Sequence, residues 1–297
     1  MTALNPEPAA QARRQRVLSG AALVTGAGLM FALAGMSIKM AGETLGSTHI
    51  LFWRNVLSLL ILTPWILWNW PHSLRPAHTG LIVLRGVSVV AALLCYYYAV
   101  TVIPLADALL FNFSAPIFVP VLGLLLFGFA LNRAVLLAVI IGFIGVALIL
   151  KPGTNLFQPV ALIALASGAL GGLSVVAIWR MPANESATRI AVFFALIGIA
   201  ITSVAIVADP RLPPPESWSP LIMLGVFSTA AHLLYVRGCL IAPTDQVSTL
   251  TYTSVFFGAA IGWMIWDERV DWFMTAGTAL VIGASAISVR AGRGTAA

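Results

Sequence analysis

The side chains in this sequence that could do chemistry are polar groups set singly in apolar runs. His232 lies in STAAHLLYVRG, and Tyr96 is the first of three consecutive tyrosines in LLCYYYAV. Tyr235 follows His232 by three residues, which places the two near the same face of a helix. Because an imidazole or a phenol is costly to bury without a partner, each either hydrogen-bonds across neighbouring segments or contacts a polar ligand. His232 could also carry a proton if its pKa is near neutral.

The patterns of enzyme active sites and metal centres are missing. The sequence contains no CxxC, HExxH, phosphate-binding glycine loop or nucleophile elbow. Cys95 and Cys239 both lie in apolar segments, as small buried hydrophobic residues do. The basic residues are scattered singly and form no stripe, which argues against nucleic-acid binding. We therefore expect no catalytic residue, metal or cofactor. A membrane-embedded enzyme is the alternative class, but its loops would need clustered catalytic groups.

The composition identifies the elements that must position these groups. Of the 297 residues, 60% are hydrophobic and only 9% are charged, and the mean hydropathy is +0.98. Soluble domains contain roughly 25% charged residues, whereas about 20 consecutive apolar residues span a bilayer as a helix. The sequence therefore predicts an all-α, multi-pass integral membrane protein, and we expect it in a bacterial inner membrane. The apolar run after QARRQR has spanning length, so we interpret it as a retained first helix and not as a signal peptide.

Ten membrane-spanning helices can be laid along the chain. Prolines, among them Pro71, Pro76, Pro104 and Pro243, mark many of the breaks between them. The predicted ranges are 17–38, 49–70, 79–102, 104–127, 132–150, 159–180, 187–208, 217–240, 245–266 and 272–290. Lys and Arg are more frequent at the ends that share a side with the amino terminus, which predicts that both termini are cytoplasmic. The tryptophans cluster near helix ends as an aromatic belt.

The second half of the sequence repeats the first at an offset of 139 residues without a gap. The offset pairs Gly86 with Gly225 and Tyr96 with Tyr235, among other identities. We therefore divide the chain into a cytoplasmic tail (1–16), two five-helix repeats (17–153 and 154–292) and a second tail (293–297). Because five is odd, the second repeat enters the membrane from the opposite side. Inverted repeats are typical of transporters, with the substrate site at the repeat interface.

The chain resembles the drug/metabolite transporter superfamily, and within it the ten-helix exporters built from two EamA-type repeats. The resemblance rests on LFWRN around Arg54, on AVTVIPLADALLFNFSAPIFVPVLGLLLF, and on APTDQVSTLTYTSVFFGAAIGWMIWDERV. The sequence departs from the pattern at Phe129, which stands where the second repeat has Glu268. The resemblance implies export of small molecules, with aromatic amino acids among the expected cargoes.

Helices 104–127 and 245–266 are predicted to line the substrate site. They contribute Asn112 and Ser114 from the first, and Thr251 and Tyr252 from the second. Prolines in a membrane helix free backbone groups that neighbours must satisfy. Two of them are therefore interpreted as a hinge, Pro116 and Pro120.

Arginines and tyrosines near the predicted site leave alternatives open. Arg54 either snorkels to the outer surface or points into a vestibule that binds a carboxylate. Snorkelling is the favoured interpretation of Arg85. Successive helix residues turn by about 100°, so the three tyrosines cannot share a face. Tyr96 is assigned to the site, and Tyr97 and Tyr98 to the belt or to helix packing.

These residues predict a monomeric secondary exporter of small metabolites. Aromatic and hydroxyl side chains suit amphipathic zwitterions, above all aromatic or branched amino acids. Multidrug export is the alternative, although a cationic drug would call for a carboxylate, and no Asp or Glu lies in the middle of a predicted span. The coupling ion is left open between facilitated export, weak coupling through His232, and proton antiport.

Overall fold

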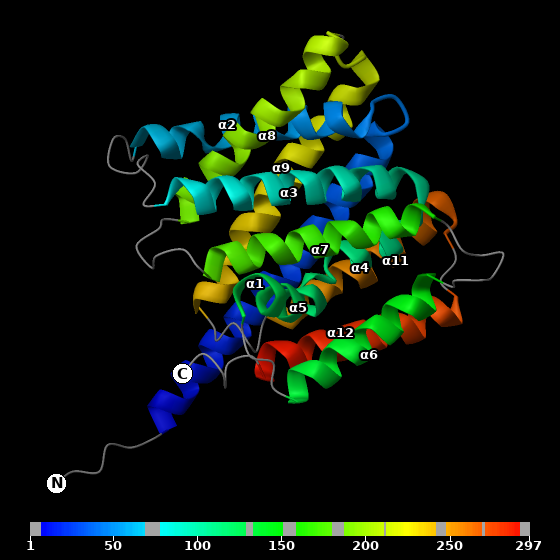
Figure 1. The fold of residues 1–297 in the computed structure, drawn as a ribbon. Helices are drawn as coiled ribbons and strands as arrows, with labels where there is room; N and C mark the ends of the chain where they lie inside the picture. The colour runs from blue at the N-terminus through cyan, green and yellow to red at the C-terminus, as the bar shows by residue number, and fades with distance from the viewer. Residues whose placement is uncertain are drawn as a thin grey trace.

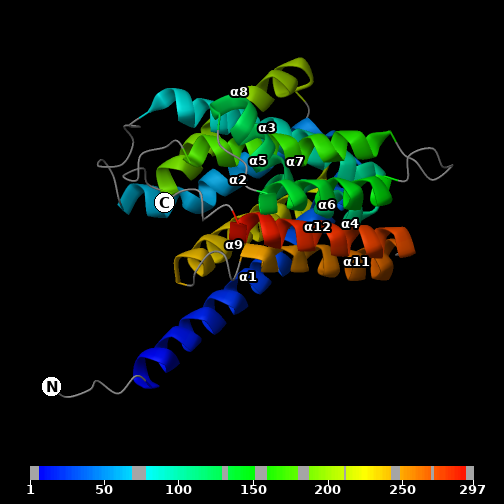
Figure 2. The ribbon, with the colours of Figure 1, turned by 60° about the horizontal axis from the view of Figure 1, so that its bottom comes forward.

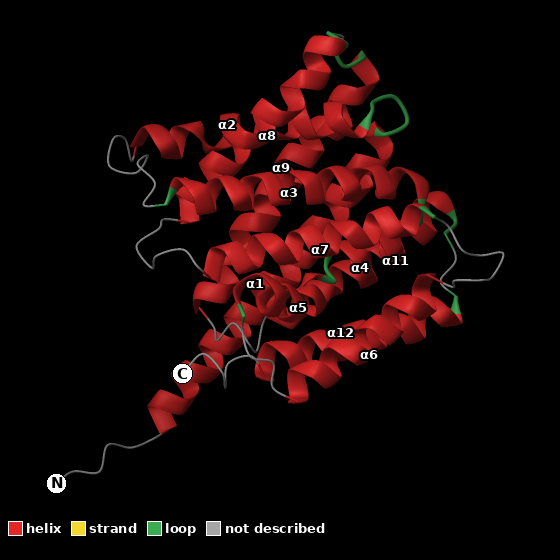
Figure 3. Cartoon of the chain, viewed as in Figure 1, coloured by secondary structure: helices red, strands yellow, loops and turns green. Residues whose placement is uncertain are grey.

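The fold is helical throughout the part of the chain that the structure, a computed structural model, describes (Figure 3). That part comprises residues 7–68, 78–128, 133–150, 159–179, 187–210, 212–241, 248–268 and 271–291. Helices α3 (Thr79–Val102) and α7 (Val160–Trp179) run side by side, and the amino-terminal end of the first helix extends beyond the others (Figure 1).

The first half of the chain forms six helices. These are α1 (Glu7–Ala41), α2 (Ser47–Trp68), α3 (Thr79–Val102), α4 (Leu105–Asn112), α5 (Ala115–Phe127) and α6 (Arg133–Leu150). The predicted helix 104–127 is therefore two helices, α4 and α5, separated at Phe113 and Ser114. The other helices lie within a few residues of the predicted ranges, except that α1 starts ten residues earlier.

The second half has the matching order. Its helices are α7 (Val160–Trp179), α8 (Ala187–Ala208), α9 (Pro215–Ile241), the short 3-10 helix η1 (Ser248–Tyr252), α11 (Thr253–Trp266) and α12 (Trp272–Ala291). The predicted helix 245–266 is again divided, at Tyr252 and Thr253. Among the described residues, five helical stretches are long and apolar enough to cross a membrane by themselves.

The packing of the helices follows the offset of 139 residues. Contact between α1 and α9 is matched by contact between their counterparts α7 and α3. The pairs α2 with α8 and α6 with α12 each join a helix to its own counterpart, and α6 and α12 run side by side in both views (Figures 1 and 2). Equivalent helices therefore make equivalent contacts.

Two helix ends show the same correspondence in their backbone. Gly128 follows α5 with φ 68°, and Asp267 follows α11 with φ 52°. Both adopt the left-handed conformation that commonly ends a helix. Glycine adopts it freely, whereas a residue with a Cβ atom does so at a cost.

Candidate functional site

The two breaks in the helices at the repeat interface share the same local hydrogen bond. In the first repeat, the Ser114 hydroxyl donates a hydrogen bond to the Phe111 carbonyl at 2.6 Å. In the second, the Thr253 hydroxyl donates to the Leu250 carbonyl, also at 2.6 Å. These are the same two positions shifted by 139 residues. Hydroxyl side chains that bond to nearby carbonyls offer the backbone an alternative to the helical pattern. The same kind of bond also occurs inside the continuous helix α7, where Ser167 donates to the Ala164 carbonyl, so the bonds accompany both breaks without accounting for them alone.

Proline contributes to only one of the two breaks. Pro116 lies in the first turn of α5 and has no N–H to offer the Asn112 carbonyl four residues earlier, where α4 ends. Its counterpart in the second repeat is Val255, and that helix is interrupted all the same. Pro120 lies inside α5, which continues past it to Phe127. Whether either proline acts as a hinge stays a prediction.

Each break is closely packed against a glycine of the other repeat. A Cβ atom on Gly28 of α1 would collide with the Thr253 side chain, and one on Gly168 of α7 would collide with Ser114. The first helix of each repeat therefore lies directly against the interrupted helix of the other. Small residues permit this kind of approach in membrane proteins.

The two breaks also bond to each other. The Tyr252 hydroxyl donates to the Phe113 carbonyl at 2.8 Å, and the two residues are 139 positions apart. Contact between equivalent positions places them beside the pseudo-two-fold axis that relates the repeats. The interruption of α4 leaves backbone carbonyls without helical partners, and the Tyr252 hydroxyl satisfies one of them.

Arg54 occupies a polar pocket of neutral partners between α2 and α9. Its Nε donates to the Ser228 hydroxyl at 3.2 Å, and its Nη1 donates to Oδ1 of Asn55 at 3.0 Å. The guanidinium also lies over the ring of Phe194, 5.2 Å from the ring centre. Arg54 is therefore held among neutral side chains inside the bundle, which favours the site over snorkelling.

Arg85 and His232 belong to the same region. Both Arg54 and Arg85 lie close enough to His232 to interact electrostatically with its ring. His232 is accessible to solvent, on the turn of α9 that follows Ser228. Arg85 is half-buried, and its Nε is buried without a hydrogen-bond partner among the described residues; whether its end snorkels stays a prediction. Arg237, in contrast, is exposed.

The three consecutive tyrosines take three different positions. Tyr96 is 5% exposed, and its hydroxyl faces Gly35 of α1. Tyr97 is 2% exposed and interacts electrostatically with Arg54. Tyr98 is 44% exposed, as expected of a residue facing lipid. Tyr97 therefore lies nearer to the arginines than the sequence interpretation assumed, and Tyr96 packs in the core.

The remaining predicted site residues are spread along the repeat interface. Tyr235 and Leu250 of η1 both pack against Val24 of α1. Asn112 is half-buried at the end of α4, and Thr251 is buried in η1. The structure thus groups Asn112, Thr251 and Tyr252 around the breaks, and Arg54 with His232 elsewhere. A role in substrate binding stays a prediction for each.

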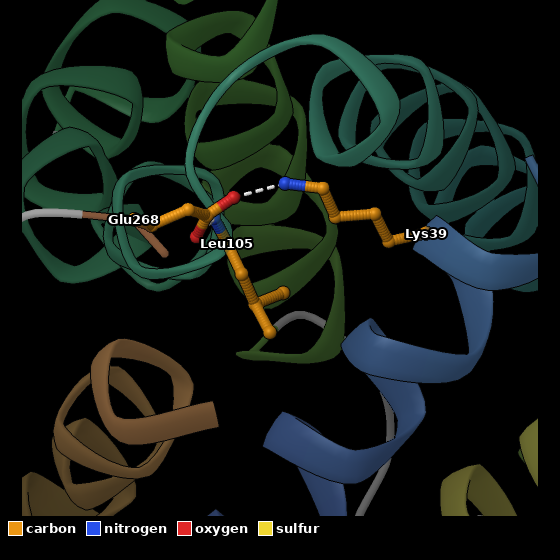
Figure 4. Close-up of polar contacts among 3 residues, drawn as sticks. All are labelled: Lys39, Leu105 and Glu268. Atoms are coloured by element: carbon orange, nitrogen blue, oxygen red, sulfur yellow. Dashed lines mark hydrogen bonds and ion pairs between the residues drawn. The ribbon is translucent and has the colours of Figure 1, made fainter. Parts of the chain in front are cut away.

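A second polar cluster joins three helices at the other end of the interface. Glu268, just after α11, forms an ion pair with Lys39 near the end of α1 (Figure 4). Its Oε2 also accepts a hydrogen bond of 2.9 Å from the backbone N–H of Leu105, the first residue of α4. A carboxylate is favoured at a helix amino terminus. We call Lys39, Glu268 and the Leu105 N–H the ionic lock.

Aromatic and backbone contacts hold the ionic lock in place. The Lys39 ammonium lies 4.8 Å from the centre of the Trp266 ring, a favourable cation–π contact. The Glu268 N–H donates to the Gly262 carbonyl at 3.2 Å, and a Cβ on Gly262 would collide with the Glu268 carboxylate. Sequence analysis noted Glu268 but missed its partner, because Lys39 stands 229 residues away.

The ionic lock has no equivalent in the other repeat. The positions that correspond to Lys39 and Glu268 are Ile178 and Phe129, and neither carries a charge. Their side chains lie outside the described part of the structure. The sequence alone therefore shows that one end of the interface has a charged pair at these positions and that the other end has two apolar residues.

Comparison with known proteins agrees with this architecture. The profile of the EamA-like transporter family matches the chain twice, over residues 18–151 and 158–290. A solved crystal structure with 18% sequence identity superposes with a TM-score of 0.61, covering 95% of this chain and 99% of its own. At that identity the likeness concerns the fold alone.

Curated relatives are transporters with diverse substrates. The pseudopaline exporter CntI of Pseudomonas aeruginosa is 26% identical, covering 89% of this chain and 93% of its own. A riboflavin transporter of Brucella anthropi is also 26% identical, with 89% and 96% covered. An S-adenosylmethionine uptake transporter of Rickettsia prowazekii is 22% identical, with 83% and 84% covered. With both halves of the sequence matched by one profile, the chain is a multi-pass membrane transporter that belongs to the EamA-like transporter family.

Proposed function

We propose that this transporter exports small amphipathic metabolites, namely aromatic and branched amino acids, by alternating access between its two repeats. The observation that carries the proposal is the contact between the two interrupted helices, where the Tyr252 hydroxyl bonds to the Phe113 carbonyl. Interrupted helices that meet at a repeat interface are where transporters of this type bind their substrates.

The polar groups near this interface favour a zwitterion. Arg54 supplies N–H donors for a carboxylate, and the freed carbonyls of the breaks supply acceptors for an ammonium group. Tyrosine and phenylalanine side chains supply apolar contact for an amino-acid side chain. The relatives include both exporters and uptake transporters, so export is part of the proposal and rests on the resemblance found in the sequence.

The proposed mechanism requires a particular membrane topology. Ten spans with both termini in the cytoplasm place the second repeat upside down with respect to the first, with the division at residues 153 and 154. Rocking of one repeat against the other then exposes the interface to each side in turn. We propose that a monomer in the bacterial inner membrane is sufficient, because each chain contains both repeats.

Flux through purified protein in liposomes tests this function. The liposomes are loaded with a panel of labelled amino acids or a lipophilic cation, with and without a pH gradient. We expect efflux of aromatic amino acids to be faster than from loaded liposomes that contain no protein. Gradient-driven flux of the cation without flux of any amino acid would instead establish a multidrug exporter.

Variants connect the flux to the interface. His232→Ala and Tyr96→Ala are expected to lower amino-acid efflux, with unchanged elution of the folded protein from a sizing column. The matched control is Leu233→Ala, because Leu233 is the neighbour of His232 but is 51% exposed on the outside of the bundle. Unchanged efflux in both site variants would remove these residues from the proposed site.

A further inference from the structure

The region around Arg54, Arg85 and His232 concentrates positive charge inside the bundle. We call these three residues the arginine–histidine cluster. Arg54 lies on α2, Arg85 on α3 and His232 on α9, so three helices from both repeats contribute. The Thr229 hydroxyl donates to the Ser58 hydroxyl at 3.2 Å and fixes α9 against α2 beside the cluster.

No carboxylate of the described residues neutralises this charge. Arg54 donates its side-chain hydrogen bonds to Ser228 and Asn55, which are neutral. A guanidinium has more N–H donors than these two contacts use. The described acidic residues lie near helix ends, for example Asp209 after α8 and Glu216 at the start of α9.

Two buried donors of the cluster region lack partners altogether. The Arg85 Nε and the Asn55 Nδ2 are both buried without a hydrogen bond among the described residues. Asn55 itself is fully buried, against Gly198 of α8. An unsatisfied donor costs free energy, and an unpaired charge at membrane depth costs more. Both unpaired groups are hydrogen-bond donors, and the guanidinium of Arg85 is cationic, so an acceptor with negative charge would suit them best.

We propose that the arginine–histidine cluster binds the anionic group, a carboxylate or a phosphate, of the transported molecule. This assignment rests on the proposed transport function and states which side chains bind the anionic group of the cargo. Arg54 is already oriented by Ser228 and Asn55, so it binds the anion with little reordering. Arg85 provides the second cation, and the exposed ring of His232 lies near both arginines as a further hydrogen-bonding group.

Binding to the purified full-length protein tests the proposal independently of transport. Four probes share one phenyl ring: L-phenylalanine, 3-phenylpropionate, phenyl phosphate and L-phenylalaninamide. Binding is measured by isothermal titration calorimetry in a neutral detergent. We expect at least one of the three anionic probes to bind, and the amide, which has no anionic group, to bind at least about 10-fold more weakly.

Charge-removing variants then locate the binding site. Arg54→Gln and Arg85→Gln are each expected to weaken binding of the anionic probe by about 10- to 100-fold, the range for a charge-assisted hydrogen bond. Arg54→Lys keeps the charge and is expected to recover part of the affinity. The matched control is Arg237→Gln, which removes an exposed arginine of α9 and should change affinity less than about 2-fold.

Several outcomes would overturn the proposal. It fails if no anionic probe binds, if the amide binds as tightly as L-phenylalanine, or if Arg54→Gln and Arg237→Gln behave alike. A further arm adds phosphatidylglycerol to the neutral detergent micelles. The proposal also fails if this lipid is the only probe that binds in an Arg54-dependent way, because the cluster is then a lipid site. Anion binding without amino-acid flux would refute the proposed function alone. Flux of both L-phenylalanine and its amide would refute the anion site alone.

Discussion

The ionic lock is expected to hold one end of the repeat interface closed. It ties the ends of α1 and α11 to the start of α4, at the end that the predicted topology places outside the cell. Replacing Glu268 by Gln removes the ion pair but keeps an oxygen that can accept from the Leu105 N–H. Replacing Lys39 by Met removes the cation and leaves the carboxylate unpaired. Both changes should favour opening at this end.

The expected magnitude follows from the burial of the pair. Exposed ion pairs contribute about 0–1 kcal/mol, but the side chains of Lys39 and Glu268 are only 17% and 13% exposed. Hydrogen bonds to charged groups contribute about 1.5–3 kcal/mol. Loss of this amount from the closed state shifts the ratio of open to closed molecules by roughly 10- to 150-fold. In the double variant, the free-energy change of opening should be smaller than the sum of the changes in the two single variants, because the two residues interact with each other.

Distances between spin labels at this end measure the shift. Labels are attached at Glu43→Cys and Trp272→Cys, two exposed positions after α1 and at the start of α12. Cys95 and Cys239 are first replaced by Ala. Electron–electron double resonance in liposomes should show a single short distance for the labelled parent, in which the ionic lock is intact, and a longer population in Glu268→Gln and Lys39→Met.

Two further variants make the test specific. Glu216→Gln removes an exposed acidic residue at the same end of the bundle and should leave the distances unchanged. Gly262→Ala changes no charge, but its Cβ displaces the Glu268 carboxylate, so it should open this end as Glu268→Gln does. Unchanged distances in Glu268→Gln, Lys39→Met and Gly262→Ala would refute the idea that the ionic lock holds the end closed.

Three further predictions concern the repeats themselves. Asp267→Gly should raise the free energy of unfolding by about 0.5–1 kcal/mol, because glycine adopts positive φ without strain. Gly128→Asp should lower this free energy by a similar amount. Thermal unfolding should therefore show shifts of the unfolding temperature of about 1–4 °C, in opposite directions for the two variants. Tyr252→Phe removes the hydrogen bond to the Phe113 carbonyl and should lower stability by about 0.5–1.5 kcal/mol, with reduced efflux from liposomes, whereas Tyr98→Phe on the exposed face should leave both unchanged. Gly28→Ala and Gly168→Ala should each lower the free energy of unfolding by about 1–3 kcal/mol, because the new Cβ meets Thr253 or Ser114. The control is Gly80→Ala, where the Cβ has open space. An equal loss of stability in this control would count against close packing at the breaks.

The apolar patterning of the sequence was sufficient to place the helices. Length and hydropathy located α3 at Thr79–Val102 without error, because a run of this kind has few alternatives in a bilayer. The offset of 139 residues, inferred from a few identities, recurs in the contacts of Tyr252 with Phe113 and in the paired breaks. Patterns that extend over many residues were therefore informative.

Features that depend on one side chain were missed. The sequence interpretation placed one continuous helix over 104–127 with a hinge at its prolines, whereas the structure has a break at Phe113 and Ser114, where Ser114 forms the bond that Thr253 repeats in the second half. Serine and threonine are common in membrane helices, so their local bonding cannot be distinguished by residue type. Tyr97 was assigned by its distance from a helix end, but which way a side chain points depends on the neighbouring helix. The partner of Glu268 could be found only in three dimensions.

The contact between Tyr252 and Phe113 also bears on the origin of the chain. In a symmetric dimer of a single five-helix unit, one residue would meet its own copy at this position, and both copies would have the same side chain. Fusion of two units into one chain permits a tyrosine on one side and a phenylalanine on the other. The same freedom allows Lys39 and Glu268 at one end, with Ile178 and Phe129 at the corresponding positions. A fused chain can therefore assign a different opening cost to each side of the membrane, which a symmetric dimer cannot do.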